Sequence, residues 1–139
     1  MDPIVLLRTA AILAGLQGFA HGALFVSAKP RHGAAEVAVI EAMKTNRFFA
    51  GATRSYWDMY FGYGLIAAGV CLVEAVLLWQ LGQVAAANPA LPRPIIGLII
   101  AANIGHVLLV ARYFMFVVPM IFDVLIAALL IWTYVALRS

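Results

Sequence analysis

The sequence predicts an all-α fold: a transmembrane antiparallel four-helix bundle with one short amphipathic helix between its first two spans. Of the 139 residues, 65% are hydrophobic and 11% are charged, and the mean hydropathy is +1.02. Soluble domains are about 45–50% apolar and about 25% charged, so this composition indicates a membrane protein. A hydrocarbon core about 30 Å thick needs about 20 residues per helix, which leaves room for four spans and one further segment. We expect one integral membrane domain, 1–139, with spans at about 3–28, 56–82, 94–114 and 119–137 and the amphipathic helix at about 34–49.

The first span begins and ends on helix signals. Asp2 is a good N-cap and Pro3 suits the first helical turn, while Lys29-Pro30 closes the segment. Polar residues interrupt its apolar run, and two of them, Gln17 and His21, are four positions apart and share a face.

Rows of small residues four positions apart are expected to bring helices close together. This spacing lets backbones approach each other and is typical of helix crossings in membranes. It also allows copies of the chain to associate as a homo-oligomer. Two rows are present, Ala14-Gly18-Gly22 in the first span and Gly97-Ala101-Gly105 in the third.

The segment between the first two spans has too few consecutive apolar residues to cross a membrane. Its central part places Val39, Ile40 and Met43 on one side of a helix, and Glu41 and Lys44 on another. We interpret this amphipathic helix as an anchor on the membrane surface. The alternative interpretation is a lid over a ligand pocket.

The second span begins with the aromatic residues Tyr56 and Trp57, which prefer the bilayer interface. Asp58 follows. Inserting a carboxylate at the bilayer centre costs roughly 2.5–3.5 kcal/mol on insertion scales, and less near the interface. We therefore expect Asp58 to have a partner or a function. At about 100° per residue, one stripe of this helix holds Asp58, Gly62, Leu65 and Gly69, and the nearly opposite stripe holds Tyr63 and Glu74.

The third and fourth spans each carry polar residues at defined depths. Pro94 suits the first turn of the third span, where Asn103 and His106 are three apart near the middle of the membrane. A very short turn at about 116–119 leads into the fourth span, which has Asp123 near its start. Short connections between spans predict antiparallel neighbours.

Charge and cysteine content restrict the function classes. The net charge of +3 lies mainly in one loop, without a basic run of the length that a nucleic-acid site needs. The lone Cys71 excludes an intrachain disulfide. By the positive-inside tendency, we expect the loop 29–55 in the cytoplasm and both termini outside. One side of the predicted topology holds Lys29, Arg31, Lys44, Arg47, Arg54 and Arg112, and the other holds Arg8, Arg93 and Arg138.

The depths of the ionisable residues divide them into two groups. Arg8 and Glu74 lie at similar distances from the helix ends on helices adjacent in sequence, so we predict that they form a structural ion pair. The second group lies in the half of the bundle nearest the long loop. Together with Tyr63 and Asn103 it forms the predicted ligand pocket: His21, Asp58, His106, Arg112 and Asp123.

Three interpretations of this pocket remain open. In the first, Arg112 neutralises Asp58 or Asp123 and the polar side chains only join helices. In the second, the pocket binds a hydrophobic molecule through one polar group. An enzyme is a variant of the second, in which a carboxylate and an imidazole move a proton on an isoprenoid or sterol-like substrate; its candidate catalytic residues are Asp58, His106, His21 and Asp123.

The third interpretation is a b-type haem held between helices, with His21 and His106 as axial ligands. A metal site made by these histidines with Asp58 is chemically feasible, but no ligand spacing supports it, and we predict none.

Three segments of the chain resemble a family of small bacterial four-helix membrane proteins of uncharacterised activity. They are Phe19-Ala20-His21-Gly22, the stretch from Arg54 to Gly64, and Leu78-Trp79-Gln80-Leu81-Gly82. The resemblance covers most of the chain and implies the fold and a bacterial cytoplasmic membrane, without a mechanism. The architecture is also similar to that of the emopamil-binding group of sterol isomerases and sterol-binding proteins, which is an analogy of fold alone.

From these observations we expect a protein that contacts membrane lipids and binds a hydrophobic or lipid-like small molecule in an intramembrane polar pocket. The alternative is a membrane enzyme with isomerase-type acid/base chemistry on a lipid or isoprenoid substrate.

Overall fold

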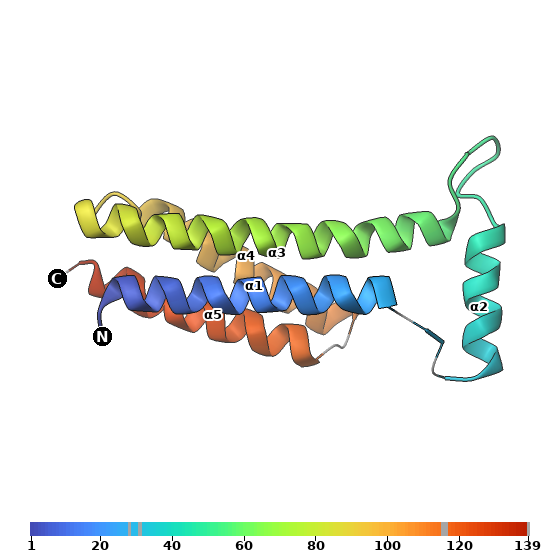
Figure 1. The fold of residues 1–139 in the computed structure, drawn as a ribbon, viewed down its shortest axis with the longest axis horizontal. Helices are drawn as coiled ribbons and strands as arrows, with labels where there is room; N and C mark the ends of the chain where they lie inside the picture. The colour runs from blue at the N-terminus through green and yellow to red at the C-terminus, as the bar shows by residue number, and fades with distance from the viewer. Residues whose placement is uncertain (28, 31, 115–116, 139) are drawn as a thin grey trace. The chain divides into compact units, whose positions relative to one another are not determined.

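The computed structural model describes residues 1–27, 29–30, 32–114 and 117–138, and every regular element in these residues is an α-helix (Figure 1). One isolated antiparallel bridge joins Arg47 and Ser55 in the loop before the second span. The predicted all-α fold is therefore confirmed. The helices are α1 (Pro3–Ser27), α2 (Ala34–Thr45), α3 (Tyr56–Ala87), α4 (Arg93–Tyr113) and α5 (Val117–Ala136).

The four long helices α1, α3, α4 and α5 have the length and hydropathy needed to cross a membrane. The protein is an integral membrane protein. Large apolar side chains such as Val73, Leu98 and Leu108 are exposed along these helices. On a soluble protein such surfaces would promote aggregation, whereas in a bilayer the lipid tails cover them.

The helix ends differ from the predicted ones where local chemistry decides them. α3 continues past Gly82 to Ala87 and ends before Asn88-Pro89, because proline cannot continue a helix. α2 ends at Thr45, earlier than the predicted 49, where the Asn46 amide donates to the carbonyl of Ala42. Ala28 and the start of the predicted turn at 116–119 lie outside the described residues.

The first of two structural units contains Met1–Gln17 and Cys71–Ser139. A β-carbon placed on Gly15 would lie 3.7 Å from Ala75, and one on Gly82 would lie 3.8 Å from Leu7, so α1 and α3 run antiparallel in close contact. All four spans contribute to the core of this unit, which makes it a helical bundle. The core consists of Leu7, Ala10, Ala11, Ala14, Leu78, Leu81, Ala85, Ile96, Ile99, Ile126 and Leu130.

The second unit, Gly18–Val70, contains the end of α1, all of α2 and the start of α3. Aromatic rings hold the two long helices together here: Phe25 lies 5.0 Å from the ring of His21 and 5.2 Å from that of Tyr60. Lys44 of α2 stands over the Trp57 ring at 5.7 Å. α2 has no buried residue among its described positions, as expected for a surface helix; its location on the membrane surface stays a prediction.

Gly64 accommodates the Phe25 ring, because a β-carbon at this position would overlap the ring. We expect Gly64→Ala to displace Phe25 from His21 and Tyr60 and to lower the free energy of unfolding by about 1 kcal/mol or more, as overpacking does. Thermal unfolding in detergent measures this change. Gly62→Ala is the matched control, since the added carbon would meet no described atom within 4 Å beyond its neighbours and the backbone of its own helix. The control should be neutral or gain up to about 1 kcal/mol from helix propensity; equal effects at both positions would contradict the assignment.

Candidate functional site

A buried carboxylate joins three helices of the first unit. Gln17 of α1 donates from Nε2 to Oδ1 of Asp123 over 2.9 Å, and Nδ1 of His106 lies 2.9 Å from Oδ2 of the same residue. A carboxylate can only accept hydrogen bonds, so His106 donates from Nδ1 to Asp123. Both oxygens of Asp123 are therefore engaged.

A second polar contact joins α3 to α4 beside the first. Asn103 donates from Nδ2 to Oε1 of Glu74 over 2.7 Å and to the carbonyl of Ile99 over 3.0 Å. Glu74 lies close enough to Asp123 and His106 for their charges to interact. We call these residues the polar network: Gln17, Glu74, Asn103, His106 and Asp123.

Helix periodicity and chain direction bring the polar network together. Asn103 and His106 are three positions apart on α4 and therefore project from neighbouring parts of one face. α4 and α5 run antiparallel, since Gly97 near the start of α4 lies beside Tyr134 near the end of α5. His106, farther along α4, consequently meets Asp123 near the start of α5.

Burial separates His106 from the other members of the network. Gln17, Asn103 and Asp123 are only 7%, 4% and 3% exposed, whereas 48% of the His106 side-chain surface is accessible. Its Nε2 makes no hydrogen bond within the part of the chain that the structure describes. Asp123 fixes the imidazole tautomer and orientation, which leaves Nε2 able to accept a hydrogen bond or a proton, or to ligate a metal.

Of the predicted pocket residues, the structure brings Asn103, His106 and Asp123 together. Gln17 and Glu74 join them, although sequence reasoning had not placed either in the pocket. For Gln17 the available signal was an uncharged polar residue inside an otherwise apolar span, which needs a hydrogen-bond partner in the membrane. Glu74 had been paired with Arg8 instead. Arg112 does not neutralise Asp123; it is exposed, with its guanidinium 5.3 Å from the centroid of the Tyr113 ring.

The predicted Arg8–Glu74 ion pair is not formed. Glu74 instead accepts the hydrogen bond from Asn103, and Arg8 is exposed, with Cζ 5.2 Å from the centroid of the Trp79 ring. Similar depth on neighbouring helices did not place the two side chains on facing surfaces. An amide satisfies the buried carboxyl group, and the guanidinium stays near an aromatic ring at the helix end.

The other predicted pocket residues lie in the second unit. His21 packs on Phe25, and Tyr63 is exposed. Asp58 completes a capping box at the start of α3: its Oδ2 accepts from the Ser55 backbone N–H at 2.8 Å and from the Ser55 hydroxyl at 3.0 Å, while the Ser55 hydroxyl accepts from the Asp58 N–H at 3.1 Å. The carboxylate that the sequence presented as unusual thus has a local structural role.

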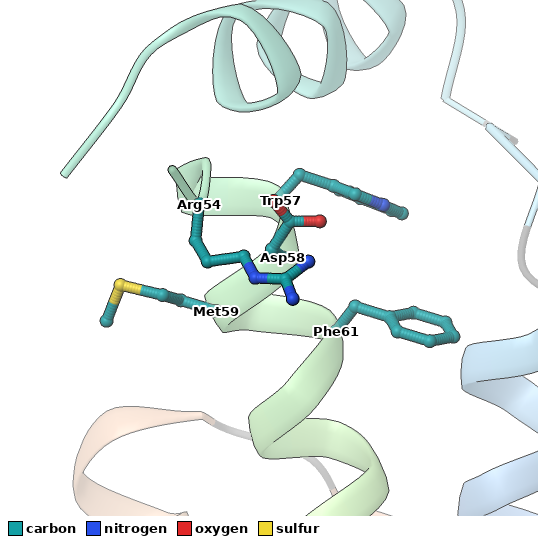
Figure 2. A pocket seen from close by; sticks show the side chains of 5 residues that line it. All are labelled: Arg54, Trp57, Asp58, Met59 and Phe61. Atoms are coloured by element: carbon teal, nitrogen blue, oxygen red, sulfur yellow. The ribbon is translucent and has the colours of Figure 1, made fainter. Parts of the chain in front are cut away.

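Asp58 also lines a shallow cleft of about 300 Å³ at the start of α3. Figure 2 shows the Arg54 side chain beside Asp58, with Trp57 and Phe61 extending to one side of the helix and Met59 to the other. The Trp57 and Phe61 rings are stacked, with centroids 6.5 Å apart. The cleft is open and formed by one short segment, so it is a less developed candidate site than the polar network.

No protein-family model, curated protein or solved structure matches this chain. Fold and site therefore define its class on their own: an α-helical integral membrane protein whose spans are joined by a network of polar side chains around a buried aspartate.

The hydrogen bond between Asn103 and Glu74 predicts an energetic coupling. In a double-mutant cycle, Glu74→Leu and Asn103→Leu should be coupled by about 0.6–1.7 kcal/mol, the range seen for hydrogen bonds between membrane helices. Stability measured by unfolding in mixed micelles provides the test. The cycle of Glu74→Leu with Arg8→Met is the control and should be additive within about 0.5 kcal/mol. The opposite result, coupling to Arg8 and none to Asn103, would restore the ion pair and reject this network.

The capping box predicts that Ser55 and Asp58 act as one stabilising element. Ser55→Ala and Asp58→Ala should each cost about 1 kcal/mol, and the double change should cost less than the sum because each removes the same reciprocal bonds. Melting temperature measures the effect. If Asp58→Ala leaves stability unchanged and instead releases a co-purified ligand, the residue belongs to a pocket.

Proposed function

We propose that this membrane protein binds a hydrophobic molecule that carries one polar group, which hydrogen-bonds to Nε2 of His106. The observation that carries the proposal is the half-exposed imidazole fixed by a buried carboxylate. Binding sites for small molecules are typically built in this way, with a few oriented polar groups within an apolar surface.

The surroundings of His106 support an apolar ligand. Ala102 and Leu109, one helical turn to either side of it, are both exposed. A molecule seated here would contact hydrocarbon side chains except at the imidazole. Without a ligand, Nε2 would face lipid tails, where an unsatisfied polar atom costs several kcal/mol by the usual order of magnitude.

A role limited to joining helices explains the buried members of the polar network but not the exposed one. Gln17, Asn103 and Asp123 satisfy one another or a neighbouring helix while buried. His106 contributes one nitrogen to that task and presents the other at the surface. A purely structural contact would have no use for the second nitrogen.

The same pair supports a second candidate, an enzyme with acid/base chemistry. A carboxylate that orients an imidazole is the usual way to prepare a general base, and Glu74 lies near enough to affect its charge. His106 would accept a proton from an isoprenoid or sterol-like substrate at Nε2. A haem would also be ligated through Nε2 of His106, and a Soret band in the purified protein would reveal it.

We further propose that the protein resides in the bacterial cytoplasmic membrane with the loop 29–55 in the cytoplasm and both termini outside. The concentration of lysine and arginine in that loop supports this orientation. α2 then lies on the cytoplasmic membrane surface, with the side that holds Val39, Ile40 and Met43 toward the lipid.

The ligand proposal is tested by native mass spectrometry and lipid extraction of gently purified protein. His106→Phe preserves an aromatic ring but removes Nε2 together with the Nδ1 donor to Asp123, and it should lose at least about tenfold of a specifically co-purifying molecule, as expected when one good hydrogen bond is lost in an apolar site. Gln17→Leu removes the other hydrogen bond to Asp123 and leaves Nε2 in place, so it controls for a disturbed network and should retain the molecule. His32→Phe, which removes a histidine of the loop before α2, is the control and should retain the molecule. If wild type and His106→Phe carry the same molecules in equal amounts, the proposal fails.

A further inference from the structure

A second site lies on the lipid-facing surface of the first unit, in a groove of about 490 Å³ between α1 and α3. None of its residues belongs to the polar network. α1 contributes one wall and α3 contributes the other. The groove is lined by Ala11, Ile12, Ala75, Val76, Trp79, Gln80 and Gln83.

The groove is apolar at one end and polar at the other. Since α1 and α3 are antiparallel, with Gly15 beside Ala75 and Leu7 beside Gly82, the positions in α1 can be matched to those in α3. Ile12, Ala75 and Val76 form the end toward the middle of the helices. Gln80 and Gln83 form the end toward the C-terminus of α3, where Arg8 stands over Trp79.

The polar end lies near the ends of both helices, where lipid headgroups are expected. Gln83 is four positions from the end of α3 and Arg8 is five positions from the start of α1, so both are within about 8 Å of a helix end at the usual rise per residue. Arg8, Gln80 and Gln83 are all exposed. Polar side chains on the outer face of membrane helices need a polar partner at this level.

Arg8 has no carboxylate partner in the part of the chain that the structure describes, because Glu74 bonds to Asn103. Its positive charge is held at the mouth of an apolar groove by the ring of Trp79. We propose that this groove binds an anionic phospholipid: its phosphate pairs with Arg8, its polar headgroup and ester oxygens accept hydrogen bonds from Gln80 and Gln83, and one acyl chain lies along Ile12, Ala75 and Val76.

The groove and an anionic phospholipid are complementary in charge and in polarity. A guanidinium matches a phosphate through paired N–H donors, and the two amides add neutral donors beside it. The apolar end of the groove then favours a phosphate that is attached to an acyl chain. A soluble phosphate would use only the arginine end, so the two sources of phosphate can be told apart by experiment.

The test measures binding of phosphatidylglycerol to the full-length protein in detergent by native mass spectrometry. Arg8→Gln should weaken binding about tenfold or more, as expected for the loss of a charge-assisted hydrogen bond. Arg138→Gln is the matched control, because that arginine also stands over an aromatic ring near a helix end, 5.3 Å from Tyr134, but outside the groove. It should change binding less than twofold, the order of a screened surface charge.

Two further measurements test the apolar end of the groove and identify the source of the phosphate. Val76→Trp fills the apolar end from an exposed position and should weaken phosphatidylglycerol binding while Arg8 remains intact. An excess of glycerol 3-phosphate should not displace the lipid. The proposal is overturned if Arg8→Gln binds phosphatidylglycerol as well as the wild type does, or if Arg8→Gln and Arg138→Gln lose binding equally. It is also overturned if Val76→Trp binds the lipid unchanged, or if glycerol 3-phosphate displaces the lipid. Because Arg8 lies outside the polar network, Arg8→Gln should retain the molecule that co-purifies through His106, which separates this site from the one at His106.

Discussion

The hydrogen bonds to Asp123 are the interaction on which the rest of the first unit depends. A carboxylate that is 3% exposed within a membrane protein is tolerable only when its oxygens are occupied, and Gln17 and His106 occupy both. These two contacts tie α5 to α1 and to α4. Since the lipid gives apolar helices little reason to prefer one another to the solvent, such directional contacts can fix which faces of the helices meet.

The polar residues of this protein are satisfied in two physically different ways. In the interior, amides and an imidazole donate short hydrogen bonds to carboxyl groups, without help from an arginine. Near the helix ends, arginines stand over aromatic rings, as Arg8 does over Trp79 and Arg93 over Tyr134. The Arg8 guanidinium is exposed near a helix end, which avoids the desolvation cost of a buried ion pair.

This separation also distinguishes the two proposed binding sites. The site at His106 offers one oriented nitrogen amid hydrocarbon and suits a molecule with a single polar group. The groove beside Arg8 offers a positive charge and two amides near the helix ends, followed by apolar walls, and suits a phospholipid. The buried carboxylate of Asp123 thus has fixed hydrogen-bond partners, and the positive charge of Arg8 is exposed, where its desolvation cost is low.

The sequence by itself determined the helical membrane fold, because composition, span length and the helix-breaking prolines act locally and need no knowledge of partners. It also located Asn103, His106 and Asp123 as polar residues at related depths. Another local signal also lies within four residues, the capping box of Ser55 and Asp58, which gives Asp58 a structural role besides its predicted place in a pocket.

Only the tertiary structure decided which polar residues meet. Depth along a helix follows from counting residues, but the rotation of each helix about its axis depends on packing against all of its neighbours. That rotation turned Glu74 toward Asn103 and left Arg8 beside Trp79, where depth alone had paired Arg8 with Glu74. It also placed Gln17 against Asp123, more than a hundred positions away in the chain, since no local pattern relates residues whose contact depends on the crossing of two distant helices.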